Sequence, residues 1–118
     1  MVNLSLTKDD AIFFMDMVGS VWGPNFKPKL HKSKPYIKIL RHKDSAEYKR
    51  FIDVYEVMKY ILTEKEIVIL NEVYGIDKEK STLQAVADSL NLSFERVRVL
   101  RNGAENKIAK ALLKLFDY

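Results

Sequence analysis

Residues 82–100, TLQAVADSLNLSFERVRVL, constrain the fold more than any other part of this chain. Their apolar residues recur with helical spacing in two runs, and the runs are separated by Asn91, which tolerates the left-handed backbone of a tight turn. Small Ala87 suits the crossing point of two helices, and Thr82 and Ser93 can cap them. This spacing predicts a helix-turn-helix, although an ordinary pair of core helices with arginines on one solvated face shares part of the pattern.

The second helix of this pair has two distinct sides on a helical wheel. Its buried side is predicted to carry Val97, Leu100 and Ala104, which point back at the first helix. Its outward side combines charged, amide and apolar residues, namely Phe94, Glu95, Arg98, Val99 and Asn102. Such a face, with further arginines beside it, is typical of a helix that enters the major groove of DNA.

The other apolar patterns are also helical, so we expect an all-α chain. Capping boxes at Thr7 with Asp10 and at Thr63 with Glu66 predict two helix starts, and Gly75 predicts a helix end. The short run 36–40, YIKIL, predicts one possible strand. The expected helices therefore cover about 8–18, 44–62, 63–75, 83–90, 93–102 and 104–116, and the last has an apolar face.

The chain of 118 residues suits one compact domain or two small subdomains that share a core. We expect an N-terminal helical subdomain over 1–61, which contains a basic loop over 19–43. Residues 62–118 are expected to form the helix-turn-helix domain. The first 60 residues resemble no family that we can name.

Charge is distributed unevenly along the chain. Residues 25–50 hold nine Lys or Arg against two acids and residues 94–118 hold six against three, whereas 51–93 hold four against eight. The basic blocks favour a polyanionic partner. The first block can be an arm that follows DNA or a solvated lysine-rich loop. The aromatic residues within or just before this block, Trp22, Phe26 and Tyr36, can stack on bases or, as is commoner for such large rings, pack beneath the arm.

The sequence lacks the residues that several kinds of metal, cofactor and catalytic site require. The sequence has no cysteine, and its two histidines, His31 and His42, stand apart without a carboxylate pattern, so no metal site is expected. No glycine-rich phosphate loop or HExxH motif occurs. We therefore expect neither an enzyme nor a cofactor. No apolar run approaches the roughly 18 to 20 residues of a membrane span, and the composition suits the cytoplasm.

Residues 62–108 carry a resemblance to a known family. LTEKE at 62–66, VYGID at 73–77, Thr82-Leu83 with Val86-Ala87, and SFERVR at 93–98 stand in the order and spacing of region 4 of bacterial primary-type sigma factors. The resemblance implies a four-helix domain that binds the −35 promoter element. It also implies docking on the flap of the RNA polymerase β subunit.

The resemblance also implies roles for individual residues. Glu95 and Arg98 match residues that touch base edges, Arg96 matches an arginine that faces the backbone, and Thr82 matches a residue near the phosphates. A guanidinium can pair with the O6 and N7 atoms of guanine, and a carboxylate can accept from the cytosine amino group. Arg101 and Lys107 would hold phosphates. The expected DNA-binding set is Thr82, Ser93, Phe94, Glu95, Arg96, Arg98, Val99, Arg101 and Asn102.

The sequence departs from the sigma pattern at three places. Phe94 and Val99 stand where the family usually has an arginine and a glutamine, and Asn102-Gly103 interrupts a helix that the family builds from good helix formers. Exposed Phe94 and Val99 can read thymine methyl groups or can form a surface for a protein partner.

Two hypotheses about function follow. The first is a bacterial or phage transcription regulator that binds double-stranded DNA by placing the 93–102 helix in the major groove. The alternative is an interaction module that docks on RNA polymerase or a related partner. In either case a homodimer can form through the apolar face of 108–116.

Overall fold

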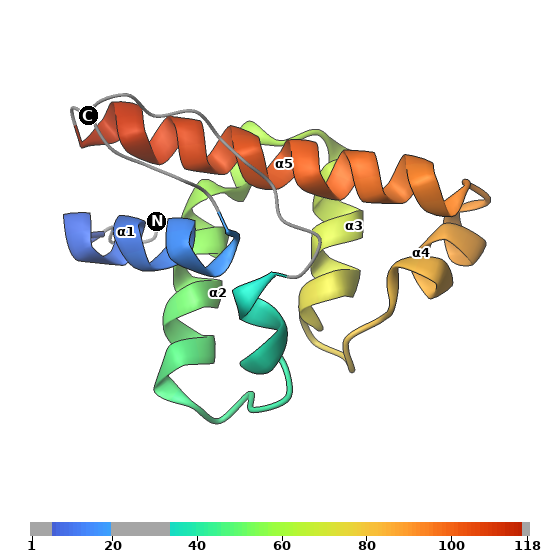
Figure 1. Ribbon diagram of the computed structural model, residues 1–118, viewed down its shortest axis with the longest axis horizontal. Coiled ribbons are helices and arrows are strands. Elements are labelled where there is room, and N and C mark those ends of the chain that lie inside the picture. The colour runs from blue at the N-terminus through green and yellow to red at the C-terminus, as the bar shows by residue number, and fades with distance from the viewer. Residues whose placement is uncertain (1–5, 20–33, 117–118) are drawn as a thin grey trace.

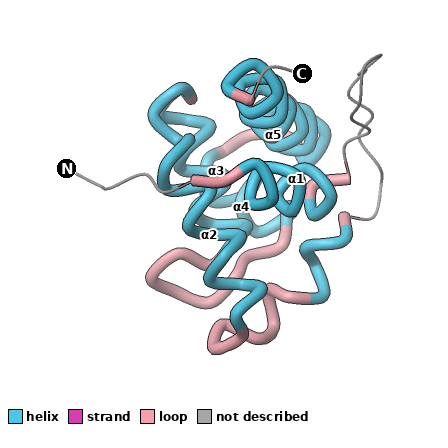
Figure 2. The backbone as a smooth tube through the Cα atoms, turned by 90° about the vertical axis from the view of Figure 1, so that its left-hand side faces the viewer, coloured by secondary structure: helices cyan, strands magenta, loops and turns pink. Residues whose placement is uncertain are grey.

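The structure is a computed structural model that describes residues 6–19 and 34–116. All regular elements in these ranges are helices, which confirms the all-α expectation (Figures 1 and 2). The α-helices are α1 (Lys8–Met17), α2 (Ala46–Met58), α3 (Glu64–Tyr74), α4 (Leu83–Leu90) and α5 (Phe94–Leu115). Two short 3-10 helices, η1 (Pro35–Lys38) and η2 (Lys59–Ile61), lie before and after α2.

Each of the five α-helices begins at a hydroxyl side chain that accepts a backbone hydrogen bond. The caps are Thr7, Ser45, Thr63, Thr82 and Ser93. Complete capping boxes are present at the starts of α1 and α3, as expected. Since a cap satisfies donors that the first turn leaves unpaired, the positions of these hydroxyls largely explain where the helices start.

The strand predicted at 36–40 is wrong, because Pro35–Lys38 forms the 3-10 helix η1. Proline is favourable at a helix start, since its fixed φ suits the turn and it has no N–H to leave unpaired. Tyr36 and Leu40 are buried while Ile37 and Lys38 are exposed, which is the four-residue spacing of a helical turn. No strand exists in the described ranges that could have paired with this segment.

The predicted division of the last helix at Asn102-Gly103 is also wrong, because α5 runs unbroken through both residues. A Cβ placed on Gly103 would find no atom within 4 Å among its described surroundings, so no close packing requires a glycine there. Burial of the helix on both sides of Gly103 outweighs the roughly 1 kcal/mol that glycine costs in a helix interior.

Helix α5 lies along the length of the molecule and contacts α1, α3 and α4 (Figure 1). Beneath it, five buried rings join α1, η1, α2 and α3. Phe14 stacks on Phe51 with 4.9 Å between ring centroids, and Tyr74 contacts three of the other rings edge-on with centroid distances of 4.9–5.2 Å. The rings are those of Phe14, Tyr36, Phe51, Tyr55 and Tyr74.

One hydrophobic core extends across both predicted subdomains. It includes Phe14 and Phe51 from the first part and Ile69, Ile108 and Leu112 from the second. The core therefore positions α5 against the N-terminal helix directly. None of the described helices is both long enough and apolar enough to cross a bilayer.

Candidate nucleic-acid interface

The turn between α4 and α5 has the conformation that the sequence predicts. Asn91 adopts the left-handed region with φ 57° and ψ 44°, and its N–H donates to the carbonyls of Ala87 and Asp88. The N–H of Leu92 donates to Ala87 O at 2.9 Å. This is the bonding pattern that ends many helices, and it also ends α3, where Gly75 takes the left-handed position. As a result, only three residues separate the end of α4 from the start of α5.

The two helices of this pair are capped by exposed hydroxyl residues. Thr82 Oγ1 accepts from the N–H of Ala85 at 3.1 Å, and Ser93 Oγ accepts from the N–H of Arg96 at 3.0 Å. Each hydroxyl still has its own proton to donate. Both caps therefore place a donor, together with a positive helix end, where a phosphate can approach.

The first two turns of α5 expose five side chains that we name the outer face. They are Phe94, Glu95, Arg96, Arg98 and Val99. The rings and methyl groups are unusually accessible, since Phe94 is 45% exposed and Val99 is 46% exposed. Val97, on the opposite side of the same turns, is fully buried. The expected division between a core side and an outward side is therefore present at these positions.

Glu95 and Arg98 form an ion pair within the outer face. Arg98 Nε donates to Glu95 Oε1 at 3.1 Å, and Arg98 Nη2 contacts Glu95 Oε2. The hydrogen bond from Arg98 lowers the pKa of the Glu95 carboxyl, and the carboxylate raises the pKa of Arg98. The two residues expected to read bases are thus fully charged and bonded to each other. With Arg96, the outer face carries a net charge of +1, from two cations and one anion.

Arg101, expected to hold a phosphate, and Asn102, expected on the outward side, do not belong to this face, because both are buried. Arg101 is 6% exposed and Asn102 is 9% exposed. Arg101 Nε donates to Asn102 Oδ1 at 2.8 Å, and Nη1 donates to the hydroxyl of Tyr36 at 3.0 Å. The helical wheel did not predict this burial, because η1, some 65 residues away in sequence, covers this part of α5.

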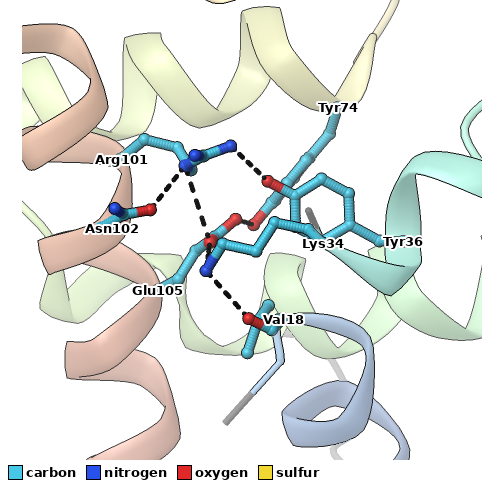
Figure 3. Close-up of polar contacts among 7 residues, drawn as sticks. All are labelled: Val18, Lys34, Tyr36, Tyr74, Arg101, Asn102 and Glu105. Carbon is cyan, nitrogen blue, oxygen red and sulfur yellow. Dashed lines mark hydrogen bonds and ion pairs between the residues drawn. The ribbon is translucent and has the colours of Figure 1, made fainter. Parts of the chain in front are cut away.

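Arg101 and Asn102 belong to a buried polar cluster (Figure 3). At its centre Glu105, fully buried, accepts a 2.5 Å hydrogen bond from the hydroxyl of Tyr74. Lys34 Nζ lies 3.1 Å from Glu105 Oε1 and donates to Val18 O at 2.9 Å. The cluster consists of Lys34, Tyr36, Tyr74, Arg101, Asn102 and Glu105.

Burial is the largest cause of the pKa shifts of Lys34, Tyr36 and Tyr74 in the cluster. It raises the pKa of Tyr36 and of Tyr74 well above the usual value, and the nearby Glu105 carboxylate raises both further. Burial lowers the pKa of Lys34, and attraction to Glu105 opposes that shift. Neither Lys34 nor Glu105 was singled out from the sequence. The available signal was weak: Arg101 and Glu105 are four residues apart on one helix.

Lys107 has a partner within the chain as well. Its amino group donates to Glu66 Oε1 at 2.9 Å, and the same oxygen accepts from the N–H of Thr63. Lys107 therefore ties α5 to the start of α3, although it was expected to hold a phosphate. Its side chain is 48% exposed, so the contact lies at the surface.

Other expected positions have mixed outcomes. Trp22, Phe26 and residues 20–33 of the basic loop lie outside the described residues. Tyr36 packs in the aromatic core, as the packing alternative has it. The apolar face of 108–116 is used within the chain, since Ile108, Ala109 and Leu112 are fully buried, and Leu115 remains exposed.

Within the described ranges, no three His, Asp or Glu side chains come together to hold a metal ion. Comparisons with protein-family models, with curated proteins and with solved structures found no match.

Proposed function

We propose that this chain is a bacterial or phage transcription regulator that binds duplex DNA with the outer face of α5 in the major groove. One observation carries the proposal. Arg96 and Arg98 project from the first turns of a helix that starts directly after the left-handed turn at Asn91. A short turn that exposes a basic helix end is the arrangement that helix-turn-helix proteins use to reach base edges. The resemblance of 62–108 to sigma region 4 supports the same choice.

Each residue of the interface has a distinct role in this proposal. Arg98 donates two hydrogen bonds to guanine, and Glu95 accepts from a cytosine amino group. Arg96 and the hydroxyls of Thr82 and Ser93 hold phosphates and set the register. Because Arg98 and Glu95 are bonded to each other in the free protein, reading a base requires that this pair reorients. Phe94 and Val99 contact thymine methyl groups.

Fluorescence anisotropy with labelled genomic duplexes tests the proposal. The variant carrying Arg96→Ala and Arg98→Ala is compared with one carrying Lys110→Ala and Lys114→Ala. The control removes the same charge from exposed positions of the same helix, about 22 Å further along its axis. We expect the arginine variant to lose most of its binding and to reduce the salt dependence by about one phosphate contact, that of Arg96, while the control stays near wild type. Equal losses in both variants, or no salt-sensitive binding at all, would contradict the proposal.

A second function is favoured by the apolar part of the outer face. Phe94 and Val99 are both large, apolar and nearly half exposed, which suits a protein partner such as RNA polymerase. If docking is the function, Phe94→Ala with Val99→Ala abolishes retention of polymerase subunits in a pull-down that includes nuclease. If polymerase is not retained by the wild-type chain, this alternative is excluded.

A further inference from the structure

A cleft of about 200 Å³ lies between η1, the end of α3, the link that precedes α4, and α5. Its apolar wall includes Ile37, Leu40 and Leu83, and its polar lining includes Thr82, Lys80 and Arg101. The cleft does not include any residue of the outer face. It nevertheless touches both helices of the pair, because Thr82 caps α4 and Arg101 belongs to α5.

Arg101 is the unusual group in this lining. It is more than nine-tenths buried, yet the small part of it that remains accessible contributes to the cleft wall. A guanidinium has five N–H donors. Only Nε and Nη1 have hydrogen-bond partners, Asn102 and Tyr36, in the part of the chain that the structure describes. Nη2 has no hydrogen-bond partner among these residues, so it can donate a charge-assisted hydrogen bond to an anion.

The charged residues in the described lining of the cleft have one sign. None of its described lining residues is acidic, whereas Arg101 and Lys80 are cations. Thr82 and Leu83 form the beginning of α4, where the first backbone N–H groups have no acceptor within the helix and the helix dipole is positive. Glu105, the nearest anion to Arg101, lies 4.0 Å from Nε and is fully buried in the polar cluster. An anion entering the cleft therefore meets donors and positive charge.

We propose that this cleft binds a small organic carboxylate with a compact apolar body. The carboxylate pairs with the Nη2 side of Arg101 and with the hydroxyl of Thr82. The apolar body lies against Ile37, Leu40 and Leu83. The volume is below the 300 Å³ or so at which drug-sized pockets begin, so the ligand is of the size of a substituted benzoate or a short branched acid. The proposal does not depend on DNA binding, and its test contains no DNA.

The test is a titration of the full, isotope-labelled chain followed by amide NMR shifts, with benzoate as the probe. Benzamide is the neutral probe of the same shape, and inorganic phosphate is the anion without an apolar body. Because changing Arg101 disturbs the buried cluster, the cleft is blocked instead by Ile37→Trp at its half-exposed rim. Ile61→Trp is the matched control, since Ile61 is comparably exposed on η2 and lies outside the lining.

We expect benzoate to cause saturable shifts at Ile37, Leu40 and residues 81–83. Benzamide and phosphate should bind about tenfold more weakly or worse, because each lacks one of the two recognised features. Ile37→Trp should abolish the shifts and Ile61→Trp should keep them. Three results would each overturn the proposal: no saturable shift with benzoate, benzamide binding as well as benzoate, or benzoate binding that persists in Ile37→Trp.

Discussion

Two glycines in this chain have opposite structural roles. Gly75 ends α3 at φ +71°, and a Cβ there would lie 2.9 Å from the backbone nitrogen of Lys80 and 3.0 Å from the carbonyl oxygen of Lys78. Gly103 lies inside α5 with open space around the position of a Cβ. Only the first glycine is required by its backbone conformation and its neighbours.

These positions give a paired prediction. Gly103→Ala should raise the free energy of unfolding by about 0.5–1 kcal/mol, because alanine is the better helix former. Gly75→Ala should lower it by more than about 1 kcal/mol, because it combines a left-handed backbone with a close contact. Urea denaturation of both variants measures the difference. A loss of stability in Gly103→Ala would show that the helix around residue 103 is packed differently.

The buried ion pair between Lys34 and Glu105 is predicted to contribute more to the free energy of unfolding than an exposed lysine does. Lys34→Met removes the nearer of the two cations beside the fully buried Glu105 carboxylate and leaves only Arg101, 4.0 Å away, and breaking a buried pair costs about 3–5 kcal/mol. Lys38→Met is the control, because Lys38 is exposed on η1 and its loss should change stability by less than about 0.5 kcal/mol. Equal midpoints of chemical denaturation for the two variants would contradict this role.

At the scale of elements, the turn at Asn91 decides how α5 leaves α4. Its left-handed backbone is one that glycine adopts freely and alanine does not. Asn91→Gly should therefore keep stability close to wild type, whereas Asn91→Ala should lower the free energy of unfolding by about 1 kcal/mol. Thermal unfolding of the two variants provides the comparison. If both behave alike, the turn does not impose the left-handed conformation.

The starts of the helices and the ends of α3 and α4 could be predicted from sequence because their causes are local. Thr63 with Glu66, Ser93, Gly75 and Asn91 act within a few residues of themselves, and their spacing is visible in the sequence. Periodicity also predicted the buried side of α5 near Val97. These signals were enough for the fold class and for the geometry of the helix pair.

The features that sequence reasoning missed depend on contacts between distant segments. Tyr36 reaches Arg101 from 65 positions away, and this contact turns a predicted phosphate ligand into a buried residue. Periodicity on one helix cannot show which neighbouring segment covers it, so it did not reveal that Arg101 and Asn102 are buried.

At the scale of the whole molecule, the buried tyrosines of the aromatic core are predicted to make the protein less stable as the pH rises into the alkaline range. Burial raises the pKa of Tyr36, Tyr55 and Tyr74 in the folded chain. Above pH 10 or so the unfolded chain therefore loses phenolic protons that the folded chain keeps, and stability that is fully present below this pH is lost as the pH rises. Lys34, whose pKa is lowered, acts in the opposite direction but is a single group.

We expect the free energy of unfolding to fall above pH 10 by about 1.4 kcal/mol per pH unit for each of these tyrosines, less the contribution of Lys34. Urea denaturation between pH 8 and pH 11 measures the slope. Tyr55→Phe should make the slope shallower even though it removes the 2.7 Å hydrogen bond to Asn71 Oδ1 and lowers stability at neutral pH. An unchanged slope in this variant would contradict the assignment.

The most direct test of the proposed function is selection of bound duplexes from a random pool by the full wild-type chain. If the outer face of α5 reads bases, repeated selection should enrich one sequence motif. The same selection with Arg98→Ala should lose the preference at one position of that motif while the flanking positions stay selected. The reason is that the two hydrogen bonds from Arg98 to guanine are worth about 1–3 kcal/mol of discrimination. A pool that remains random after selection, or a motif that is identical with Arg98→Ala, would contradict base reading by this helix.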